Sequence, residues 1–258
     1  MSSVIISLIQ TSTRWHDPAA NRQLFSQWLD RTSAQARLVL LPEMFTTGFT
    51  MAPEQVFETM AGPTVAWLRA EATTRQKVIG GSVVIGEQGQ YFNRFLWAQP
   101  DGAMQHYDKR HCFRMAGEHE HYAAGTARPV WPTGSMRVRP LVCYDLRFPV
   151  WLRRRDDYDL LACVANWPAA RLDAWRTLLK ARAIENQSYV AGVNILGRDG
   201  AGVEYAGGSV VYGPDGQCLL DAQDREGVFS VELDLDHLAR YRAAFPAWQD
   251  ADGFQLID

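Results

Sequence analysis

Three residues stand where their chemistry could be used: Cys143, Glu43 and Lys109. Cys143 ends the apolar run that begins at Leu141 and opens a short turn. A thiol there would be held at the carboxyl edge of a sheet, where α/β proteins bind ligands, with backbone N–H groups near enough to receive an oxyanion. The alternative is a buried, inert thiol, because cysteine is among the most buried residue types. The pattern therefore allows a nucleophile without requiring one.

Glu43 and Lys109 carry the charges that a thiol nucleophile could use. Glu43 directly follows the apolar run Leu38 to Pro42, where partial removal from water would raise the pKa of the carboxyl group and make it a usable base. Lys109 lies in a charged segment, and an ammonium group beside a developing oxyanion stabilises it and favours a nearby thiolate. Taken singly, a solvated loop acid and a surface lysine are the commoner outcomes.

The segment 111–121 offers weaker chemistry, although it is dense in residue types that bind zinc. These are His111, Cys112, Glu118, His119, Glu120 and His121. Their spacing matches neither HExxH nor paired CxxC, so solvated side chains are the better interpretation and no metal is expected. The other cysteines, Cys163 in an expected strand and Cys218 after an expected turn, are interpreted as ordinary thiols.

Bulk composition narrows the classes of function. The 258 residues, 47% of them hydrophobic, can bury a full-sized core. A net charge of -3 gives no general attraction to nucleic acid. No apolar run reaches the ~18–20 residues of a membrane span, and the first residues lack the pattern of a secretory signal. We therefore expect a cytoplasmic protein with free thiols and neither a nucleic-acid nor a membrane partner.

The elements that must position these residues alternate between strands and helices. Apolar runs predict strands over residues 4–10, 38–41, 78–85, 91–98, 140–143, 159–166, 188–195, 207–212 and 228–233. Helices are predicted after Asp17-Pro18, over residues 64–76 and 149–154, and after residue 171. Turns are predicted at residues 86–89 and 214–216. No linker interrupts the chain, so we expect one α/β domain over residues 1–258, with two mixed sheets beneath outer helices.

Three sequence blocks resemble those of the nitrilase, or carbon–nitrogen hydrolase, superfamily. They are Leu41-Pro-Glu43-Met-Phe, Tyr107-Asp-Lys109-Arg-His and Leu141-Val-Cys143-Tyr-Asp-Leu-Arg-Phe-Pro149, in the order and at the usual separations of that family. Asn166-Trp-Pro, the segment 175–186 and Asn194 further resemble its ω-amidase branch. Three ordered blocks across nearly the whole chain make a far more specific match than any single motif.

This resemblance implies a four-layer α-β-β-α sandwich of the nitrilase type and an amidohydrolase that needs no metal or organic cofactor. It implies that Glu43 is the general base and that Cys143 forms a thioester intermediate. Lys109 and the backbone N–H of Tyr144 would hold the oxyanion. It also implies a homodimer joined through helices near the nucleophile.

The resemblance also implies further site residues. For a second glutamate that orients the amide and the water, Glu118 fits the family spacing better than Glu120. Asn166 and Trp167 are expected among the substrate-binding residues. The implied substrate is a small dicarboxylic monoamide such as 2-oxoglutaramate.

The far carboxylate of such a substrate needs a fixed cation, and the planar fork of arginine suits it. Arg114 and Arg147 lie close in sequence to the catalytic blocks. We favour Arg114, at a position where related amidases can carry an acid, while Arg147 could instead pair with Asp145.

A nitrilase or carbamoyl-amide hydrolase is the alternative enzyme, and a non-catalytic thiol sensor is the alternative outside enzymes.

Overall fold

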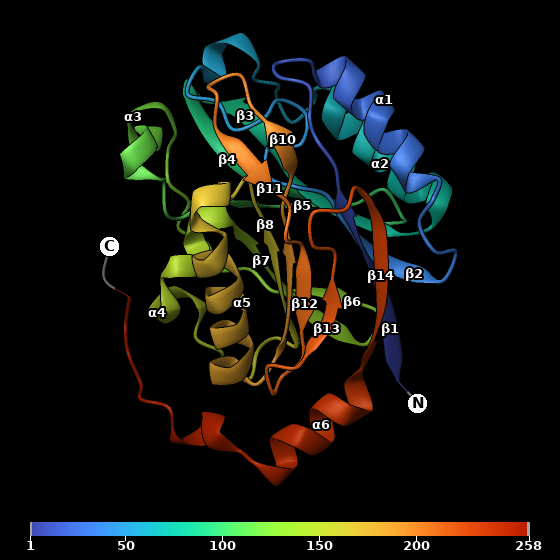
Figure 1. The fold of residues 1–258 in the computed structure, drawn as a ribbon, viewed down its shortest axis with the longest axis vertical. Coiled ribbons are helices and arrows are strands. Elements are labelled where there is room, and N and C mark those ends of the chain that lie inside the picture. The colour runs from blue at the N-terminus through green and yellow to red at the C-terminus, as the bar shows by residue number, and fades with distance from the viewer. Residues whose placement is uncertain (1, 257–258) are drawn as a thin grey trace.

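Two six-stranded mixed sheets form the centre of the computed structural model, which describes residues 2–256 (Figure 1). The first sheet has the order β14 (Gly227–Asp234), β1 (Ser3–Gln10), β2 (Ala36–Leu40), β3 (Val78–Glu87), β4 (Gln90–Ala98) and β5 (Met104–Asp108). The second has the order β13 (Cys218–Asp221), β12 (Val210–Tyr212), β9 (Tyr189–Val193), β8 (Leu160–Val164), β7 (Met136–Val142) and β6 (Trp131–Thr133). A separate hairpin joins β10 (Leu196–Arg198) to β11 (Glu204–Ala206).

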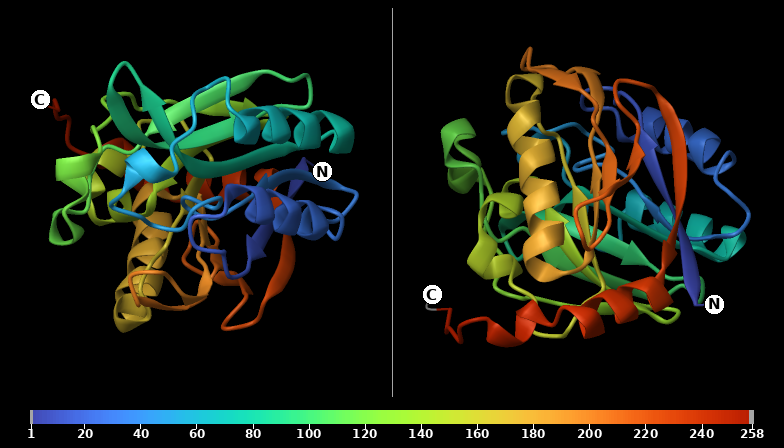
Figure 2. Two further views of the ribbon diagram at one scale, coloured as in Figure 1. Left: turned by 90° about the horizontal axis from the view of Figure 1, so that it is seen from above. Right: turned by 60° about the horizontal axis from the view of Figure 1, so that its bottom comes forward.

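Helices lie outside both sheets. α1 (Pro18–Leu29) and α2 (Pro63–Arg75) pack against the first sheet, and α5 (Leu172–Asn186) packs against the second beside the short α4 (Pro149–Leu152) (Figure 1). The one-turn α3 (Glu118–His121) precedes β6, and α6 (Leu235–Ala244) lies at the end of the sandwich near the N-terminus (Figure 2). The four-layer α-β-β-α sandwich expected from the resemblance is thereby confirmed.

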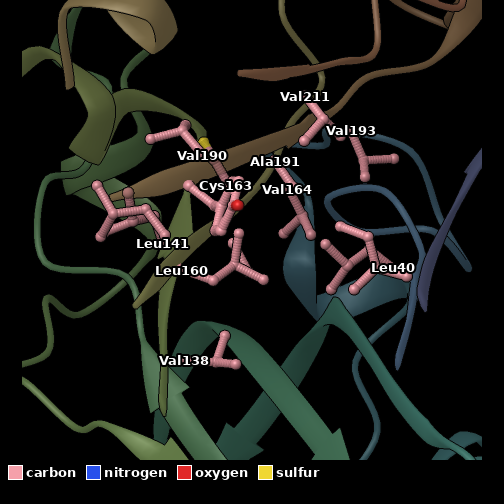
Figure 3. Packing of buried hydrophobic residues seen from close by; sticks show 14 of the residues in the cluster. Leu40, Val138, Leu141, Leu160, Cys163, Val164, Val190, Ala191, Val193 and Val211 are labelled. Carbon is pink, nitrogen blue, oxygen red and sulfur yellow. The ribbon is translucent and has the colours of Figure 1, made fainter. Parts of the chain in front are cut away.

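The inner faces of the two sheets meet in one apolar core. Leu40 of the first sheet lies among side chains of the second, which include Val138, Leu160, Val164 and Val193 (Figure 3). All five side chains are completely buried. Burial of a Leu or Val side chain contributes about 1.5–3 kcal/mol, so this interface holds the strand ends of both sheets in a fixed relation.

Local signals explain most of the predicted elements. Asp17 caps α1 by accepting from the Ala20 N–H at 3.0 Å, and Pro18 occupies the first turn. The hairpin between β3 and β4 turns over Gln88 and Gly89, whose φ angles of 51° and 78° match a two-residue turn with positive φ. The turn is thus two residues long, shorter than the predicted 86–89, because pairing continues to Glu87.

Other predictions were incomplete. The helix after Asp17-Pro18 was predicted without its polar buried residue: its buried face is Asn21, Phe25 and Leu29, and the apolar Leu24 and Trp28 are partly buried. Asn21 can be buried because its amide donates to the backbone carbonyls at positions 14 and 46. Of the elements in residues 2–256, seven α-helices and strands were not predicted: β5, β6, β10, β11, β13, α3 and α6. Within residues 2–256, no helix combines the length and the apolar character that a membrane crossing requires.

Candidate active site

The strand ends of the two sheets bring the sequence blocks together. Glu43 follows β2, Lys109 follows β5, Cys143 follows β7 and Asn166 follows β8. β7 and β8 are parallel, so their carboxyl ends lie at the same edge of the second sheet. Asn166 joins that edge to the first sheet, because its backbone N–H donates to Glu43 Oε2 at 2.8 Å and its amide Nδ2 donates to the Glu43 carbonyl at 3.0 Å.

Glu43, Lys109 and Glu118, which we name the charged floor, form a buried cluster. Each is at most 1% exposed. Lys109 Nζ lies 3.0 Å from Glu43 Oε1 and 3.0 and 2.9 Å from the two carboxylate oxygens of Glu118. Glu118 rather than the exposed Glu120 therefore contacts the lysine. Glu43 is therefore not a solvated loop acid, and Lys109 is not a surface lysine.

The charges of the floor control its proton affinities. Burial disfavours the ammonium form of Lys109, but the charges of Glu118 and Glu43 outweigh burial and raise its pKa well above the ordinary value. Burial raises the pKa of Glu118, and the charge of Lys109 opposes that shift only in part. The nearby charge of Glu43 adds to the upward shift of the Glu118 pKa.

Cys143 is the first residue of a 3-10 turn, Cys143–Arg147, and not the last residue of the strand. Its φ angle of 47° lies in the left-handed region, which non-glycine residues adopt at a cost of about 1–3 kcal/mol. Asp145 stabilises the turn, since its Oδ2 accepts from the Val142 N–H at 3.1 Å and from Tyr107 Oη at 2.8 Å. The same side chain binds His111, so it links the turn to the segment that carries Lys109.

The proton affinity of the Cys143 sulfur depends on burial and on two nearby charges, of which Lys109 favours the thiolate as expected. Burial, followed by the negative charge of Glu43, raises the pKa of the Cys143 thiol well above its ordinary value. Lys109 acts in the opposite direction but is outweighed. At neutral pH the sulfur is therefore protonated, and a reaction through it requires a base at the moment of attack.

A cavity of about 710 Å³ opens onto Cys143 and Lys109. Its wall is largely apolar and includes Phe113, Tyr144 and Trp167, and the β10–β11 hairpin contributes Tyr205. A volume of this size is in the range of sites for small molecules. Asn166 and Trp167, both expected at the substrate, line it together with Tyr144.

Two arginines, Arg147 and Arg171, line this cavity, and we name them the arginine rim. The Arg147 guanidinium lies 5.0 Å from the centre of the Trp167 ring, and that of Arg171 lies 5.5 Å from the Phe113 ring. Among residues 2–256, neither forms an ion pair with a carboxylate. Asp145 pairs with His111, so the expected alternative pairing of Asp145 with Arg147 is not formed.

Arg114, which the sequence analysis favoured as the carboxylate ligand, is exposed and does not line the cavity, although Phe113 and Met115 on either side of it do. Arg147, by contrast, lines the cavity. Arg171 was missed altogether, and the only sequence signal for it was its place five residues after Asn166 in the same loop.

The ligand types in segment 111–121 do not converge. Glu118 binds Lys109, His111 Nδ1 lies 2.8 Å from Asp145 Oδ1, and the Cys112 thiol faces the Tyr122 carbonyl at 3.6 Å. His119, Glu120 and His121 are exposed. Over residues 2–256, no three His, Cys, Asp or Glu side chains are arranged to hold a metal ion.

Comparison with known proteins gives consistent matches along the chain. The model of the carbon–nitrogen hydrolase family matches residues 5–243. Omega-amidase YafV of Escherichia coli is 46% identical over 99% of this chain and 100% of its own length. The 2-oxoglutaramate amidase of Bacillus subtilis is 31% identical over 95% of this chain and 96% of its own. A CN-hydrolase superfamily protein from Xanthomonas campestris, solved with an arsenic adduct in its active site, has 48% identity and a TM-score of 0.96, covering 99% of this chain and 100% of its own.

Proposed function

The chain belongs to the carbon–nitrogen hydrolase family, and on that premise we propose that it is an ω-amidase. It hydrolyses the terminal amide of a small dicarboxylic acid monoamide, such as 2-oxoglutaramate, to the acid and ammonia. One observation carries the proposal: a single cavity holds a thiol beside a buried acid–lysine cluster and, on its wall, two guanidinium groups that have no carboxylate partner within residues 2–256. The relatives named for ω-amides and for 2-oxoglutaramate support the same substrate class.

The first half of the reaction forms an acyl-enzyme. Glu43 removes the thiol proton as Cys143 Sγ attacks the amide carbon, and Lys109 with the Tyr144 N–H stabilises the oxyanion. Glu43 returns the proton to the amide nitrogen, the C–N bond breaks, and ammonia leaves behind a thioester on Cys143. Because the resting sulfur is protonated, attack and proton transfer to Glu43 are coupled.

The second half releases the acid. Glu43 removes a proton from water, which attacks the thioester carbon, and the same oxyanion contacts stabilise the second tetrahedral species. The C–S bond then breaks, Glu43 returns the proton to the sulfur, and the acid product departs. Glu118 orients the amide nitrogen and the water, while its contact with Lys109 keeps the ammonium in place.

The arginine rim supplies the selectivity for an acidic amide. An uncompensated guanidinium group in a partly enclosed cavity attracts a carboxylate, and two of them can share its oxygens. The guanidinium groups of Arg147 and Arg171 lie over the rings of Trp167 and Phe113, which hold them in place. Arg147 and Arg171 therefore take the role that was expected of Arg114.

A panel of substrates tests this proposal. Purified protein is incubated with 2-oxoglutaramate, with a neutral amide of the same chain length, and with the matching nitrile, and the release of ammonia is measured. We expect fast turnover of the acidic amide, slow turnover of the neutral amide and little of the nitrile. Preference for the nitrile, or equal turnover of both amides, would contradict the proposal.

We further propose that this single domain over residues 1–258 acts as a cytoplasmic homodimer that joins through α4 and α5. These helices lie side by side, linked by Arg153 Nη1 to the Glu185 carbonyl at 3.1 Å (Figure 1). They expose Val150 and Ile184, at 52% and 47%. Apolar side chains so exposed on adjacent helices are suited to a self-complementary contact. Sedimentation at micromolar concentration should show a dimer, and a fully active monomer would contradict it.

A further inference from the structure

We propose that Asn93 is a positioning residue that holds the carboxylates of Glu43 and Glu118 in their working geometry; the inference deepens the proposed function and rests on it. Asn93 lies in β4 and is 1% exposed. Its amide Nδ2 donates to Glu43 Oε1 at 2.8 Å and to Glu118 Oε1 at 3.3 Å. One neutral donor thus contacts both carboxylates of the charged floor.

Ser82 determines which end of the Asn93 amide faces those carboxylates. Ser82 Oγ accepts from the Met44 N–H at 2.8 Å and donates to Asn93 Oδ1 at 2.8 Å. A hydroxyl has a single proton, so its donation to Oδ1 leaves Nδ2 directed toward Glu43 and Glu118. The same hydroxyl also anchors Met44, whose φ angle of 41° marks the turn directly after the general base.

The main chain of Asn93 contacts the third member of the floor. Its carbonyl accepts from the Lys109 N–H at 3.0 Å. Substitution of the side chain leaves this main-chain bond available, so side-chain variants test the amide group separately from the strand that carries it. Asn93 is absent from the described wall of the cavity, so it acts on the substrate only through the glutamates.

The amide is needed because two buried carboxylates share one lysine. Like charges in a site of low polarity favour protonation of one member of the pair. Hydrogen bonds donated to the charged form act in the opposite direction and keep a carboxylate ionised. Burial already raises the pKa of Glu118, and without the Asn93 amide Glu118 would take up a proton at a still higher pH and lose its working contact with Lys109.

The central test is the pH–rate profile of Asn93→Ala. Loss of a hydrogen bond to a charged group predicts a fall in kcat of about 10- to 150-fold with little change in KM. The acid limb should move upward by about one to two pH units, because Glu118 binds its proton more tightly. Ser82→Ala should also lower kcat and raise the pH of the acid limb, but by less, since the Asn93 amide then loses only the contact that orients it.

The variant Asn93→Asp separates hydrogen-bond donation by the side chain from the volume that the side chain occupies. The variant keeps the size of the side chain and can still accept from Ser82, but its ionised carboxylate donates nothing to Glu43 or Glu118. We expect it to lose at least as much activity as Asn93→Ala. If Asn93→Asp keeps wild-type activity, or if Asn93→Ala keeps the wild-type acid limb, the inference is overturned.

Asn186 offers a matched control, because it is also 1% exposed and hydrogen-bonded, in this case to the main chain at residues 154 and 182. Asn186→Ala should lower thermal stability and leave the acid limb unchanged.

A second readout is the pH dependence of Cys143 alkylation by iodoacetamide, in which Glu43 takes the same thiol proton. If wild-type protein released no ammonia, the proposed function would fail, and alkylation would still decide the role of Asn93.

Discussion

The charged floor and the arginine rim of the cavity are built in opposite ways. On the floor, each charge is buried and bound to an opposite charge or to a backbone or side-chain donor. At the rim, Arg147 and Arg171 are half-buried, and their cationic groups face aromatic rings instead of carboxylates. The charges of the floor are thus paired within the protein, whereas neither arginine of the rim forms an ion pair with a carboxylate among residues 2–256.

This difference separates two tasks within one cavity. A preorganised floor stabilises charges that develop during the reaction, whatever the remainder of the substrate. An uncompensated rim contributes binding free energy only when the substrate brings a carboxylate. Substitutions on the floor should therefore slow all amides alike, and substitutions at the rim should slow acidic amides alone.

The largest expected effect comes from removing the base of the floor. Glu43→Gln should keep the fold and lower kcat by at least ~10³ for acidic and neutral amides alike, the upper range of general-base catalysis. Combining it with Lys109→Met should cost far less than the product of the two single losses, because the floor acts as a unit. Steady-state kinetics of the two single variants and the double variant measure these losses. If the loss in the double variant equals the product of the two single losses, the charged floor does not act as a unit.

A smaller and selective effect is expected at the rim. Arg147→Met and Arg171→Met should each lower kcat/KM for the acidic amide by about 10- to 150-fold, the result of losing a hydrogen bond to a charged group. Turnover of the neutral amide should stay nearly unchanged. Arg114→Met is the matched control, because Arg114 is exposed outside the cavity, and it should affect neither substrate. Equal losses for both amides would assign the rim a structural role.

The smallest expected signal concerns the proton on Cys143. Its pKa is raised above the ordinary value of 9.0, so the thiol stays protonated as the pH rises through that value. The ultraviolet absorbance of thiolate in wild-type protein minus that in Cys143→Ala should therefore stay near zero up to pH 9. A thiolate difference at neutral pH would show that Lys109 outweighs burial and the charge of Glu43.

Strand ends made much of the floor predictable from the sequence. Glu43 and Cys143 stand directly after apolar runs that could be recognised as buried strands, and family spacing favoured Glu118 over Glu120. The position of Lys109 was harder to predict. β5, which precedes it, is a polar strand at the edge of its sheet, and this segment was interpreted as a charged loop. The family resemblance and the sandwich it implied are both confirmed.

The rim could not be predicted in the same way. Arg114 and Arg171 are both arginines near a catalytic block in the sequence, and only the path of their loops places one outside the cavity and the other on its wall. That path depends on long-range packing, which residue spacing does not encode. Asn93 was overlooked for a related reason, since a lone asparagine in an apolar strand acquires meaning only from the carboxylates that tertiary structure brings to it.

The most direct test of the account is whether a covalent intermediate forms on Cys143. Protein is mixed with 2-oxoglutaramate, quenched in acid and weighed intact by mass spectrometry, alongside Cys143→Ala and the buried-thiol control Cys163→Ala. Wild-type and Cys163→Ala protein should gain the mass of the acyl group and release ammonia, and Cys143→Ala should do neither. Ammonia release by Cys143→Ala at a rate near that of wild type would contradict the thioester mechanism.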